Sequence, residues 1–337
     1  VAADAKPNFV FLMSEDNSKH FMKMFDPNGP STPNIESLAA QGIAFDRAFC
    51  NGPVCSVARS TLITGSHAPR IGTQYHRKSA TVPMPEGLRM FPAYLRDAGY
   101  FTVTNGKKDY NALEDAGVWD KSVPEASWRD RKPGQPFFFT QSFGASHESA
   151  LHFSEPSMAQ QPTKTDPATV FVPPIHPDTP TFRYTYAHYH DRIQEMDKKI
   201  GAVVAALEAD GLLDDTFIFY FGDNGGVLPG SKGFANETGL HVPLVVRIPK
   251  NFKHLVDAPA GTRVGGFVSF VDFAPTVLNL TGIKTPQSMD GRPFLGPGIT
   301  LAEVNQRDET FGYADRFDEK TDLVRTLRKG RFKYVRS

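Results

Sequence analysis

Continuous apolar runs that stop abruptly at polar or glycine residues recur along the chain, and they predict buried β-strands. A strand that is buried on both faces of a sheet shows such an unbroken run instead of an alternating pattern. We expect five strands of this kind, over residues 8–13, 100–104, 136–140, 216–221 and 242–247.

Segments between these runs show the spacing of amphipathic helices. The longest is 184–209, where Ile193 and Met196 belong to one apolar stripe and Gly211 lies just past the end. Residues 150–182, rich in Pro, Thr and Gln, predict a long surface loop. Shorter helices are expected over 32–42, 59–64, 91–98 and 271–280, the second of them entered from a loop that carries Cys55.

Alternating strands and helices predict an α/β fold, with a large, mainly parallel sheet sandwiched by helices. In such sheets ligands bind beyond the carboxyl ends of the strands, so the residues that follow each run are candidates for function. The pattern changes after Pro293, where 311–313 and 330–335 are typical of antiparallel strands. We therefore expect a main domain over 1–300 and a small C-terminal antiparallel subdomain over 301–337, incomplete in this chain.

Composition and charge narrow the class of protein. The 337 residues are 40% apolar and 22% charged, which is ordinary globular usage, and 37 Lys+Arg balance 37 Asp+Glu. A neutral chain argues against a general nucleic-acid binder, and no apolar run is long enough for a transmembrane helix. The two cysteines, Cys50 and Cys55, exclude a disulfide framework. Three possibilities stay open for the pair: both are buried thiols, they form one small disulfide, or one of the two thiols is chemically active.

Acidic and amide side chains follow two of the predicted strands. Glu15 and Asp16 end the first, and Asp223 and Asn224 end a later one. Pairs at the same edge of a parallel sheet can converge, and carboxylate and amide oxygens are the ligands that hard cations such as Ca²⁺ prefer. Acidic residues after strands also serve as caps and turn formers, so this pattern alone leaves both interpretations open.

The segment 55–65, Cys-Ser-Val-Ala-Arg-Ser-Thr-Leu-Ile-Thr-Gly, carries a more specific signal. It resembles the signature of the formylglycine-dependent sulfatases, in the alkaline-phosphatase-like superfamily, which is Cys-x-Pro-x-Arg followed by Leu-x-Thr-Gly. Further matches follow in the family's order, at 7–16, Gly106-Lys107, Gly222-Asp223-Asn224-Gly225, Lys232 with 239–244, and 328–334. The chain departs from the family pattern at Val57 in place of Pro, Glu15 in place of Asp, Asp109 in place of His and Ala150 in place of His.

The resemblance implies covalent chemistry at residue 55. In this family a separate maturation enzyme oxidises the cysteine to formylglycine, and the aldehyde hydrates to a geminal diol. One hydroxyl attacks sulfur, the alcohol leaves, and the second hydroxyl expels sulfate as the aldehyde re-forms. An unmodified thiol would have no easy route to release sulfate. Cys55 is therefore the expected nucleophile precursor.

The resemblance also implies a role for each neighbouring residue. One divalent metal ion, expected to be Ca²⁺, would be held by Glu15, Asp16, Asp223 and Asn224. Arg59 would brace the diol, Lys107 and Lys232 would neutralise charge on the sulfuryl oxygens, and an imidazole would protonate the leaving alcohol. That imidazole is His147 or His152, and His147 is preferred.

The implied reaction is hydrolysis of sulfate esters, with a sulfated carbohydrate or polysaccharide as the favoured substrate. Residues expected to face the mouth of the site and bind the sugar are His76, Arg77, Asp109 and His241. Such a substrate suggests a secreted or periplasmic enzyme, with no nucleic-acid partner. Two alternatives stay open: a phosphomonoester or phosphodiester hydrolase on the same scaffold, and a catalytically silent protein that binds sulfated glycans.

Overall fold

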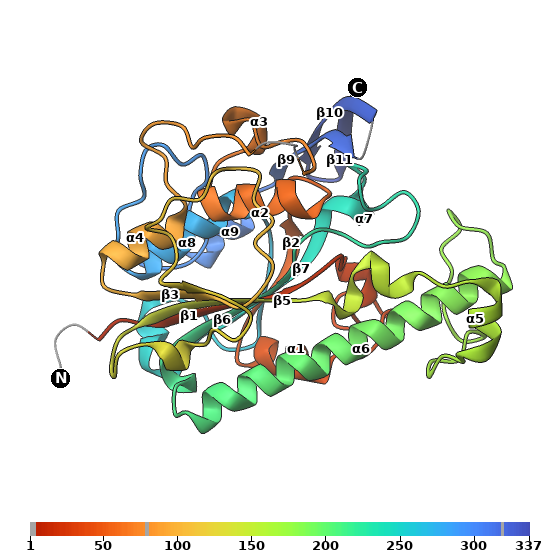
Figure 1. Ribbon diagram of the computed structural model, residues 1–337, viewed down its shortest axis with the longest axis horizontal. Helices are drawn as coiled ribbons and strands as arrows, with labels where there is room; N and C mark the ends of the chain where they lie inside the picture. Colours follow the sequence, from red (N-terminus) through yellow and green to blue (C-terminus); the bar gives the residue numbers. More distant parts are fainter. Residues whose placement is uncertain (1–4, 78–80, 318–319) are drawn as a thin grey trace.

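An eight-stranded sheet crosses the middle of the protein (Figure 1), in a computed structural model that describes residues 5–77, 81–317 and 320–337. Its strands lie in the order β4-β3-β5-β1-β6-β7-β2-β8. Their bounds are β1 (Asn8–Ser14), β2 (Gly42–Phe49), β3 (Phe101–Thr104), β4 (Lys121–Ser122), β5 (Phe137–Phe143), β6 (Thr216–Gly222), β7 (His241–Arg247) and β8 (Thr262–Ser269).

The sheet is mainly parallel, as predicted. Among its described strands, β7 alone runs antiparallel to its neighbours, β6 and β2. Because β7 is reversed, its first residue lies at the edge of the sheet where the parallel strands end. The loop between β6 and β7 therefore stays at that edge and can contribute to a site there.

Helices cover both faces of the sheet (Figure 1), with α2, α4, α8 and α9 on one face and α1 and α6 on the other. The strand period of two explains why: Phe9 and Phe11 join one buried cluster, and Val10 and Leu12 join the other. Among the described helices, none combines the length and apolar character that crossing a bilayer requires. The helices are α1 (Pro33–Ala40), α2 (Cys55–Thr64), α3 (Ala68–Ile71), α4 (Phe91–Asp97), α5 (Glu155–Gln160), α6 (Pro180–Ala209), α7 (Glu237–Leu240), α8 (Phe273–Leu280) and α9 (Leu301–Asn305).

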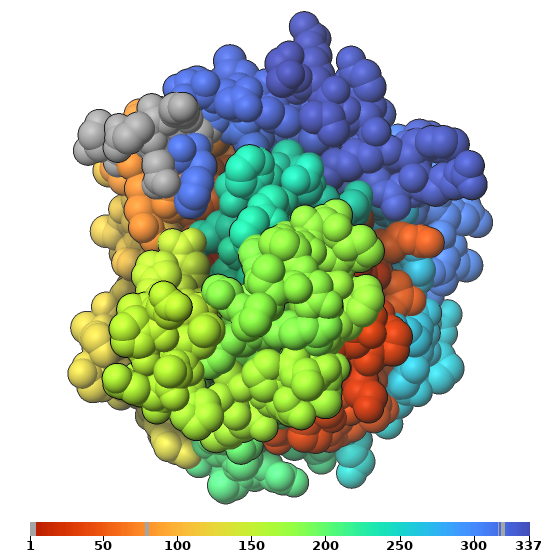
Figure 2. Space-filling model, turned by 90° about the vertical axis from the view of Figure 1, so that its right-hand side faces the viewer, coloured from red at the N-terminus to blue at the C-terminus, as the bar shows by residue number. Residues whose placement is uncertain are grey.

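Two predicted segments differ from the structure. Cys55 is the first residue of α2, whereas the sequence placed it in a loop before the helix. All ten residues of α2 are buried, so it shows no amphipathic stripe that would mark its start. The predicted surface loop over 150–182 contains α5 and the first turn of α6, and Figure 2 shows this yellow-green segment spread over the face in view.

A separate three-stranded antiparallel sheet follows, made of β9 (Glu309–Phe317), β10 (Lys320–Lys329) and β11 (Phe332–Arg336). This confirms a small C-terminal antiparallel sheet, and β10 joins the two strands that were predicted. Tyr313 of β9 packs against Val54 and Val57, so the small sheet contacts the start of α2. The domain boundary near residue 300 stays a prediction.

Candidate active site

Nine of the predicted site residues come together at the carboxyl edge of the large sheet. We call them the Cys55 cluster, and they are Glu15, Asp16, Cys55, Arg59, Lys107, His147, Asp223, Asn224 and Lys232. They come from the ends of β1, β3, β5 and β6, from the start of α2 and from the loop before β7. The predicted residues therefore converge at the edge of the sheet where the parallel strands end.

The two acidic motifs meet because β1 and β6 are neighbours, with Ser14 opposite Gly222. The Asp16 amide donates to Asp223 Oδ1 at 3.0 Å, and Asn224 Nδ2 donates to Asp16 Oδ1 at 2.9 Å. Asp16 has a φ of 53°, in the left-handed region that few side chains favour. A Cβ on Gly222 would lie 2.3 Å from the Asn17 carbonyl oxygen, so glycine is required for this close approach.

Cys55 faces this acidic pair from the first turn of α2. Its Sγ lies 3.8 Å from Asp16 Oδ1, and the side chain is fully buried. Burial, together with the charges of Asp223 and Asp16, raises the pKa of the Cys55 thiol well above its ordinary value. The unmodified thiol is therefore neutral at physiological pH, and a neutral thiol is a weak nucleophile.

Arg59 lies one helical turn after Cys55 and is fully buried. Its Nε and Nη2 donate to Asp223 Oδ2 at 3.0 and 2.8 Å, and its Nη1 donates to the Lys107 carbonyl at 2.7 Å. Burial opposes the charge, but the Asp223 and Glu15 carboxylates raise the pKa of Arg59 above its ordinary value. Arg59 therefore stays charged and ties the end of β6 to the loop after β3.

Two lysines approach the carboxylates from different loops. Lys107 Nζ donates to Glu15 Oε2 at 3.2 Å, and Lys232 Nζ donates to Asp16 Oδ2 at 2.8 Å. Burial favours the neutral amines, yet the nearby carboxylates, Asp223 and Glu15 for Lys107 and Asp16 for Lys232, raise both pKa values. Both lysines are thus cationic and face the place where an anionic group would bind.

His147 directs Nε2 into the cluster. That nitrogen lies 3.8 Å from Glu15 Oε2, 3.8 Å from Asp16 Oδ2 and 3.5 Å from Lys232 Nζ. The other ring nitrogen, Nδ1, is 2.8 Å from Ser149 Oγ, which fixes the ring orientation. His152, the sequence alternative, is exposed and ends the short helix at Glu148–Leu151. The geometry favours His147 as the proton donor.

Two residues that the sequence analysis missed also contact the cluster. The Glu148 amide donates to Asp16 Oδ2 at 2.9 Å, and the Glu148 carboxylate pairs with Lys232 at 3.0 Å. The Tyr189 hydroxyl, from the middle of α6, donates to the main-chain carbonyl of Asp16. Glu148 could have been found as the neighbour of His147, whereas Tyr189 lies on an ordinary helical stripe and gives no such signal.

Three of the four predicted sugar-binding residues lie next to the cluster. His76 Nδ1 is 3.0 Å from Ser56 Oγ, beside Cys55 on α2. Arg77 pairs with Asp109 at 3.2 Å, and Asp109 lies 3.5 Å from Lys107 Nζ. These three residues border the lysine side of the cluster.

His241 is placed elsewhere. Its ring stacks on Phe49 with centroids 4.5 Å apart, and its Nε2 lies 2.8 Å from the Asp46 carbonyl. It is buried at the start of β7, and none of its described side-chain contacts involves the Cys55 cluster. The geometry therefore gives no support to His241 as a sugar-binding residue.

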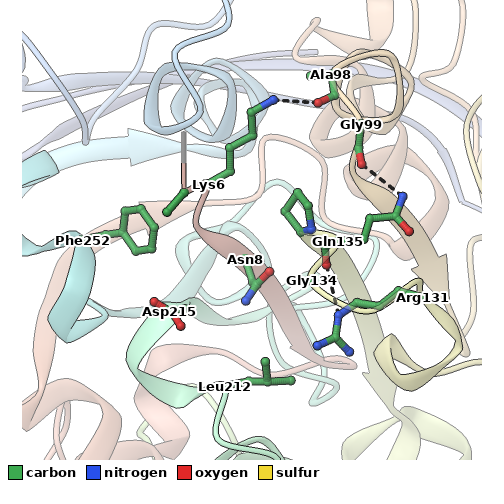
Figure 3. A pocket seen from close by; sticks show the side chains of 12 residues that line it. Lys6, Asn8, Ala98, Gly99, Arg131, Gly134, Gln135, Leu212, Asp215 and Phe252 are labelled. Atoms are coloured by element: carbon green, nitrogen blue, oxygen red, sulfur yellow. Dashed lines mark hydrogen bonds between the residues drawn. The ribbon is translucent and has the colours of Figure 1, made fainter. Parts of the chain in front are cut away.

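A pocket of about 490 Å³ lies at the opposite edge of the large sheet, where β1 and β5 begin. Figure 3 shows Lys6 donating to the Ala98 carbonyl and Gln135 donating to the Gly99 carbonyl inside it. No residue of the Cys55 cluster lines this pocket. Size alone therefore does not identify the reactive site.

The donor set fits a hard divalent cation. Asn224 Oδ1 is buried and has no hydrogen-bond partner within the described residues. The Nδ2 of the same amide donates to Asp16 Oδ1, the main-chain amide of Asp16 donates to Asp223 Oδ1, and buried polar atoms of this kind normally have a partner. Oxygen ligands from carboxylates and one amide are the chemistry that Ca²⁺ and Mg²⁺ prefer.

Comparison with known families agrees with this geometry. The family model described as sulfatase matches residues 7–122 and 115–283. The model described as the C-terminal part of N-sulphoglucosamine sulphohydrolase matches residues 231–336. Together the two models span nearly the whole described chain.

Individual relatives extend the comparison. An ulvan-active sulfatase of Formosa agariphila is 32% identical over 376 residues, which cover 98% of this chain and 61% of that protein. The chain therefore spans about three fifths of the length of that relative.

A solved structure of a protein in complex with its substrate, D-glucosamine-2-N,6-O-disulfate, has a TM-score of 0.73 at 18% identity, covering 98% of this chain and 88% of the other. A phosphonate monoester hydrolase of Agrobacterium radiobacter has a TM-score of 0.77 at 19% identity, covering 98% and 87%. At these identities the two structures show a shared fold.

Proposed function

Because this chain belongs to the sulfatase family, we propose that it hydrolyses sulfate esters on a sulfated carbohydrate, with residue 55 as the source of the nucleophile. The observation that carries the proposal is the position of Cys55 Sγ, 3.8 Å from Asp16 Oδ1, with Lys232 Nζ on the same carboxylate and Lys107 Nζ on the neighbouring Glu15 carboxylate. The relatives described as acting on ulvan and on a glucosamine disulfate support a sulfated glycan as the substrate class.

Cys55 would first be oxidised to formylglycine by a maturation enzyme. The hydrated aldehyde would supply both the attacking oxygen and a second hydroxyl through which sulfate can leave. The raised pKa of the buried thiol supports this step, because the cysteine itself is a weak nucleophile in this environment.

A divalent cation, which we propose to be Ca²⁺, would be held by Asp16, Asp223, Asn224 and Glu15. When bound it would supply positive charge next to residue 55 and to the sulfate oxygens. Glu15 is one methylene longer than the aspartate typical of this position, and its Oε1 lies 3.8 Å from Arg59 Nη2. Arg59 holds the Asp223 carboxylate in place for this role.

The remaining side chains would act on the sulfate and the leaving group. Lys107 and Lys232 would neutralise charge on the sulfuryl oxygens as it develops. His147 would protonate the departing alcohol from Nε2, a general-acid contribution of roughly 10²–10⁴ in rate. His76, Arg77 and Asp109 would contact the sugar beside Lys107.

The decisive experiment follows residue 55 through maturation and catalysis. Protein made together with a formylglycine-generating enzyme should show the mass loss of thiol-to-aldehyde conversion in the peptide over 48–59, and it should release sulfate from sulfated oligosaccharides. Cys55→Ala should lose both signals. Cys50→Ala, which alters the other buried thiol of the same peptide, should keep both. Full activity of Cys55→Ala would overturn the proposal.

A substrate panel separates sulfate hydrolysis from the alternatives. Sulfated oligosaccharides should turn over faster than an aryl phosphate or a phosphonate monoester, which the shared fold alone does not decide. Tight glycan binding without turnover, despite a confirmed aldehyde at residue 55, would show a silent binding protein instead. A glycan outside the cell would require export, so a secreted or periplasmic location is part of the proposal.

A further inference from the structure

Beside the loop that carries Lys232 lies a pocket of about 280 Å³ that contains none of the Cys55 cluster. Ser231 lines it from that loop, and Thr238 lines it from α7, which follows the loop. Its other walls come from the segment after β1, from 171–176 and from α6, and Figure 2 shows these red, green and teal segments bordering one another on a single face. Four segments far apart in sequence therefore build one cavity.

The wall of this pocket is largely aromatic. Phe21 contacts Tyr186 with ring centroids 6.2 Å apart, and both rings line the cavity. Phe171 stands at the rim with 49% of its surface exposed. Small-molecule pockets typically combine such an apolar wall with a few fixed polar groups, and an aromatic ring can pack against the C–H face of a sugar.

His190 of α6 supplies an unsatisfied polar group to the cavity. Only 7% of this residue is exposed, and its ring nitrogens make no hydrogen bond within the described part of the chain. Burial lowers the pKa of His190 to about 4, although Asp191 opposes the shift, so the ring is neutral at pH 7. A neutral imidazole offers one N–H donor and one acceptor, and buried polar groups are normally paired. A ligand with hydroxyl groups would satisfy both nitrogens.

The walls are tied to each other before any ligand binds. His176 Nδ1 is 2.8 Å from the Tyr186 hydroxyl, and His176 Nε2 is 2.9 Å from the Pro229 carbonyl. One ring thus links the 171–176 segment, α6 and the loop before Lys232. A cavity that is formed in advance loses less conformational entropy when it binds a ligand.

The charge of the lining selects among ligands. Among the residues described around the pocket, none is Lys or Arg, and Asp26 contributes a carboxylate. Asp26 Oδ2 lies 3.1 Å from His20 Nδ1, which also lines the pocket. A sulfated or carboxylated sugar would meet the Asp26 carboxylate with no Lys or Arg among the described lining residues to balance it, whereas a neutral sugar can donate its hydroxyls to Asp26 and Asn28. The pocket is thus chemically unlike the Cys55 cluster, which is rich in cations.

We propose that this pocket binds a neutral pyranose, as a subsite for an unsulfated unit of the glycan whose sulfate ester is cleaved at residue 55. The aromatic wall would take the apolar face of the ring, and His190, Asp26 and Asn28 would bond its hydroxyls. The assignment to a glycan rests on the proposed function, but the pocket itself does not depend on catalysis.

The test uses Cys55→Ala protein, so that turnover plays no part. Methyl glucoside, methyl galactoside, methyl xyloside and methyl rhamnoside are titrated while protein NMR signals are followed. At least one should bind saturably, and Phe171→Ala should weaken that binding by about tenfold or more. His190→Gln should weaken it as well. Phe311→Ala, which removes a ring of matched exposure (50%) on β9, should leave it unchanged.

Three outcomes would overturn the inference: no saturable binding by any of the four glycosides, equal binding in Phe171→Ala, or a sulfated methyl glycoside that shifts the NMR signals of the pocket residues at a lower concentration than its neutral parent does. Activity assays keep this inference apart from the proposed function. Sulfate release without glycoside binding would refute only the subsite. Glycoside binding without sulfate release would refute only the hydrolase.

Discussion

Arg59 and Arg77 each pair with an aspartate, but one pair is buried and the other is exposed. Arg59 contacts Asp223 at 2.8 Å with both side chains enclosed, whereas Arg77 contacts Asp109 at 3.2 Å with 55% of the arginine side chain exposed. Removing one partner of a buried pair leaves an uncompensated charge, which costs about 3–5 kcal/mol. An exposed pair contributes about 0–1 kcal/mol.

Arg59→Met should therefore lower the free energy of unfolding by about 3–5 kcal/mol, while Arg77→Met should change it by less than about 1 kcal/mol. Urea unfolding of unmatured protein in a chelator checks this without a contribution from bound metal. Similar losses in the two variants would show that Asp223 is not stabilised by Arg59.

Asn224 Oδ1 leads to a prediction about calcium. If this buried oxygen is a ligand, Ca²⁺ should raise the melting temperature of the protein, by mass action on the folded state. Asn224→Leu should raise the apparent dissociation constant for Ca²⁺ by about tenfold or more. Asn251→Leu, at an exposed amide that bonds Asp215, is the control and should behave like the parent. Unchanged calcium affinity in Asn224→Leu would remove Asn224 from the metal site.

Residues of the Cys55 cluster could be predicted where neighbours in sequence carry the signal. Asp16 and Asp223 are 207 residues apart, yet both follow strands, and strand ends of a parallel sheet share one edge. Tyr189 could not be predicted, because its hydroxyl bond to Asp16 depends on how α6 packs under β1. The surroundings of His241 could not be predicted for a related reason: its position before a strand is visible in the sequence, but its stacking on Phe49 is not.

At the scale of elements, α6 supports the Cys55 cluster from the face of the sheet that it shares with α1. The Tyr189 hydroxyl donates to the carbonyl of Asp16, whose φ of 53° is unfavourable for a residue with a side chain. Burial, followed by the charge of Asp16, raises the pKa of Tyr189 well above its ordinary value, so the hydroxyl keeps its proton. The helix thus stabilises a strained backbone at a proposed metal ligand.

Tyr189→Phe should lower the free energy of unfolding by about 1–3 kcal/mol, because a buried carbonyl loses its donor, and it should weaken Ca²⁺ binding. Tyr184→Phe is the matched control, since its hydroxyl also donates to a carbonyl, at Gln161, but in a peripheral segment. Thermal unfolding with and without Ca²⁺ measures both effects. Equal calcium affinities in the two variants would argue against a role for the Tyr189 hydroxyl in holding Asp16.

Of the described strands that the sequence did not predict, β2 and β8 were missed for local reasons. In β2, Asp46 and Arg47 break the apolar run at an irregularity in the pairing with β7. In β8, Gly265 and Gly266 interrupt the pattern, and a Cβ on Gly266 would lie 1.8 Å from the Val304 carbonyl oxygen. Bulges and close approaches to a neighbouring helix are tertiary requirements, which a hydrophobic pattern does not encode.

At the scale of the whole molecule, the small sheet is joined through Glu237 of α7 to the edge of the large sheet that carries the Cys55 cluster. Its carboxylate contacts Arg328 Nε at 2.8 Å, Lys333 Nζ at 3.9 Å and His241 Nδ1 at 3.7 Å. The α7 helix follows the Lys232 loop directly, and the C-terminal family model begins at residue 231, within that loop. The position of the second sheet and that of Lys232 are therefore linked through a few residues.

This junction predicts an acid-sensitive contribution to stability. Burial opposes ionisation, but the hydrogen bond with His241 and the charges of Lys333 and Arg328 lower the pKa of Glu237 from 4.5 to about 2. Between those values the unfolded chain binds a proton that the folded chain does not, so this contribution is present above pH 4.5 and is lost as the pH falls toward 2. Because the Glu237 side chain is partly exposed, this contribution to the free energy of unfolding is about 1 kcal/mol or less.

Glu237→Gln should thus reduce the loss of stability between pH 6 and pH 3.5 in urea unfolding. The control variant Glu125→Gln, at an exposed carboxylate after β4, should lose as much stability as the parent. An identical acid dependence in the parent and Glu237→Gln would mean that other contacts hold the second sheet against the edge that carries the Cys55 cluster.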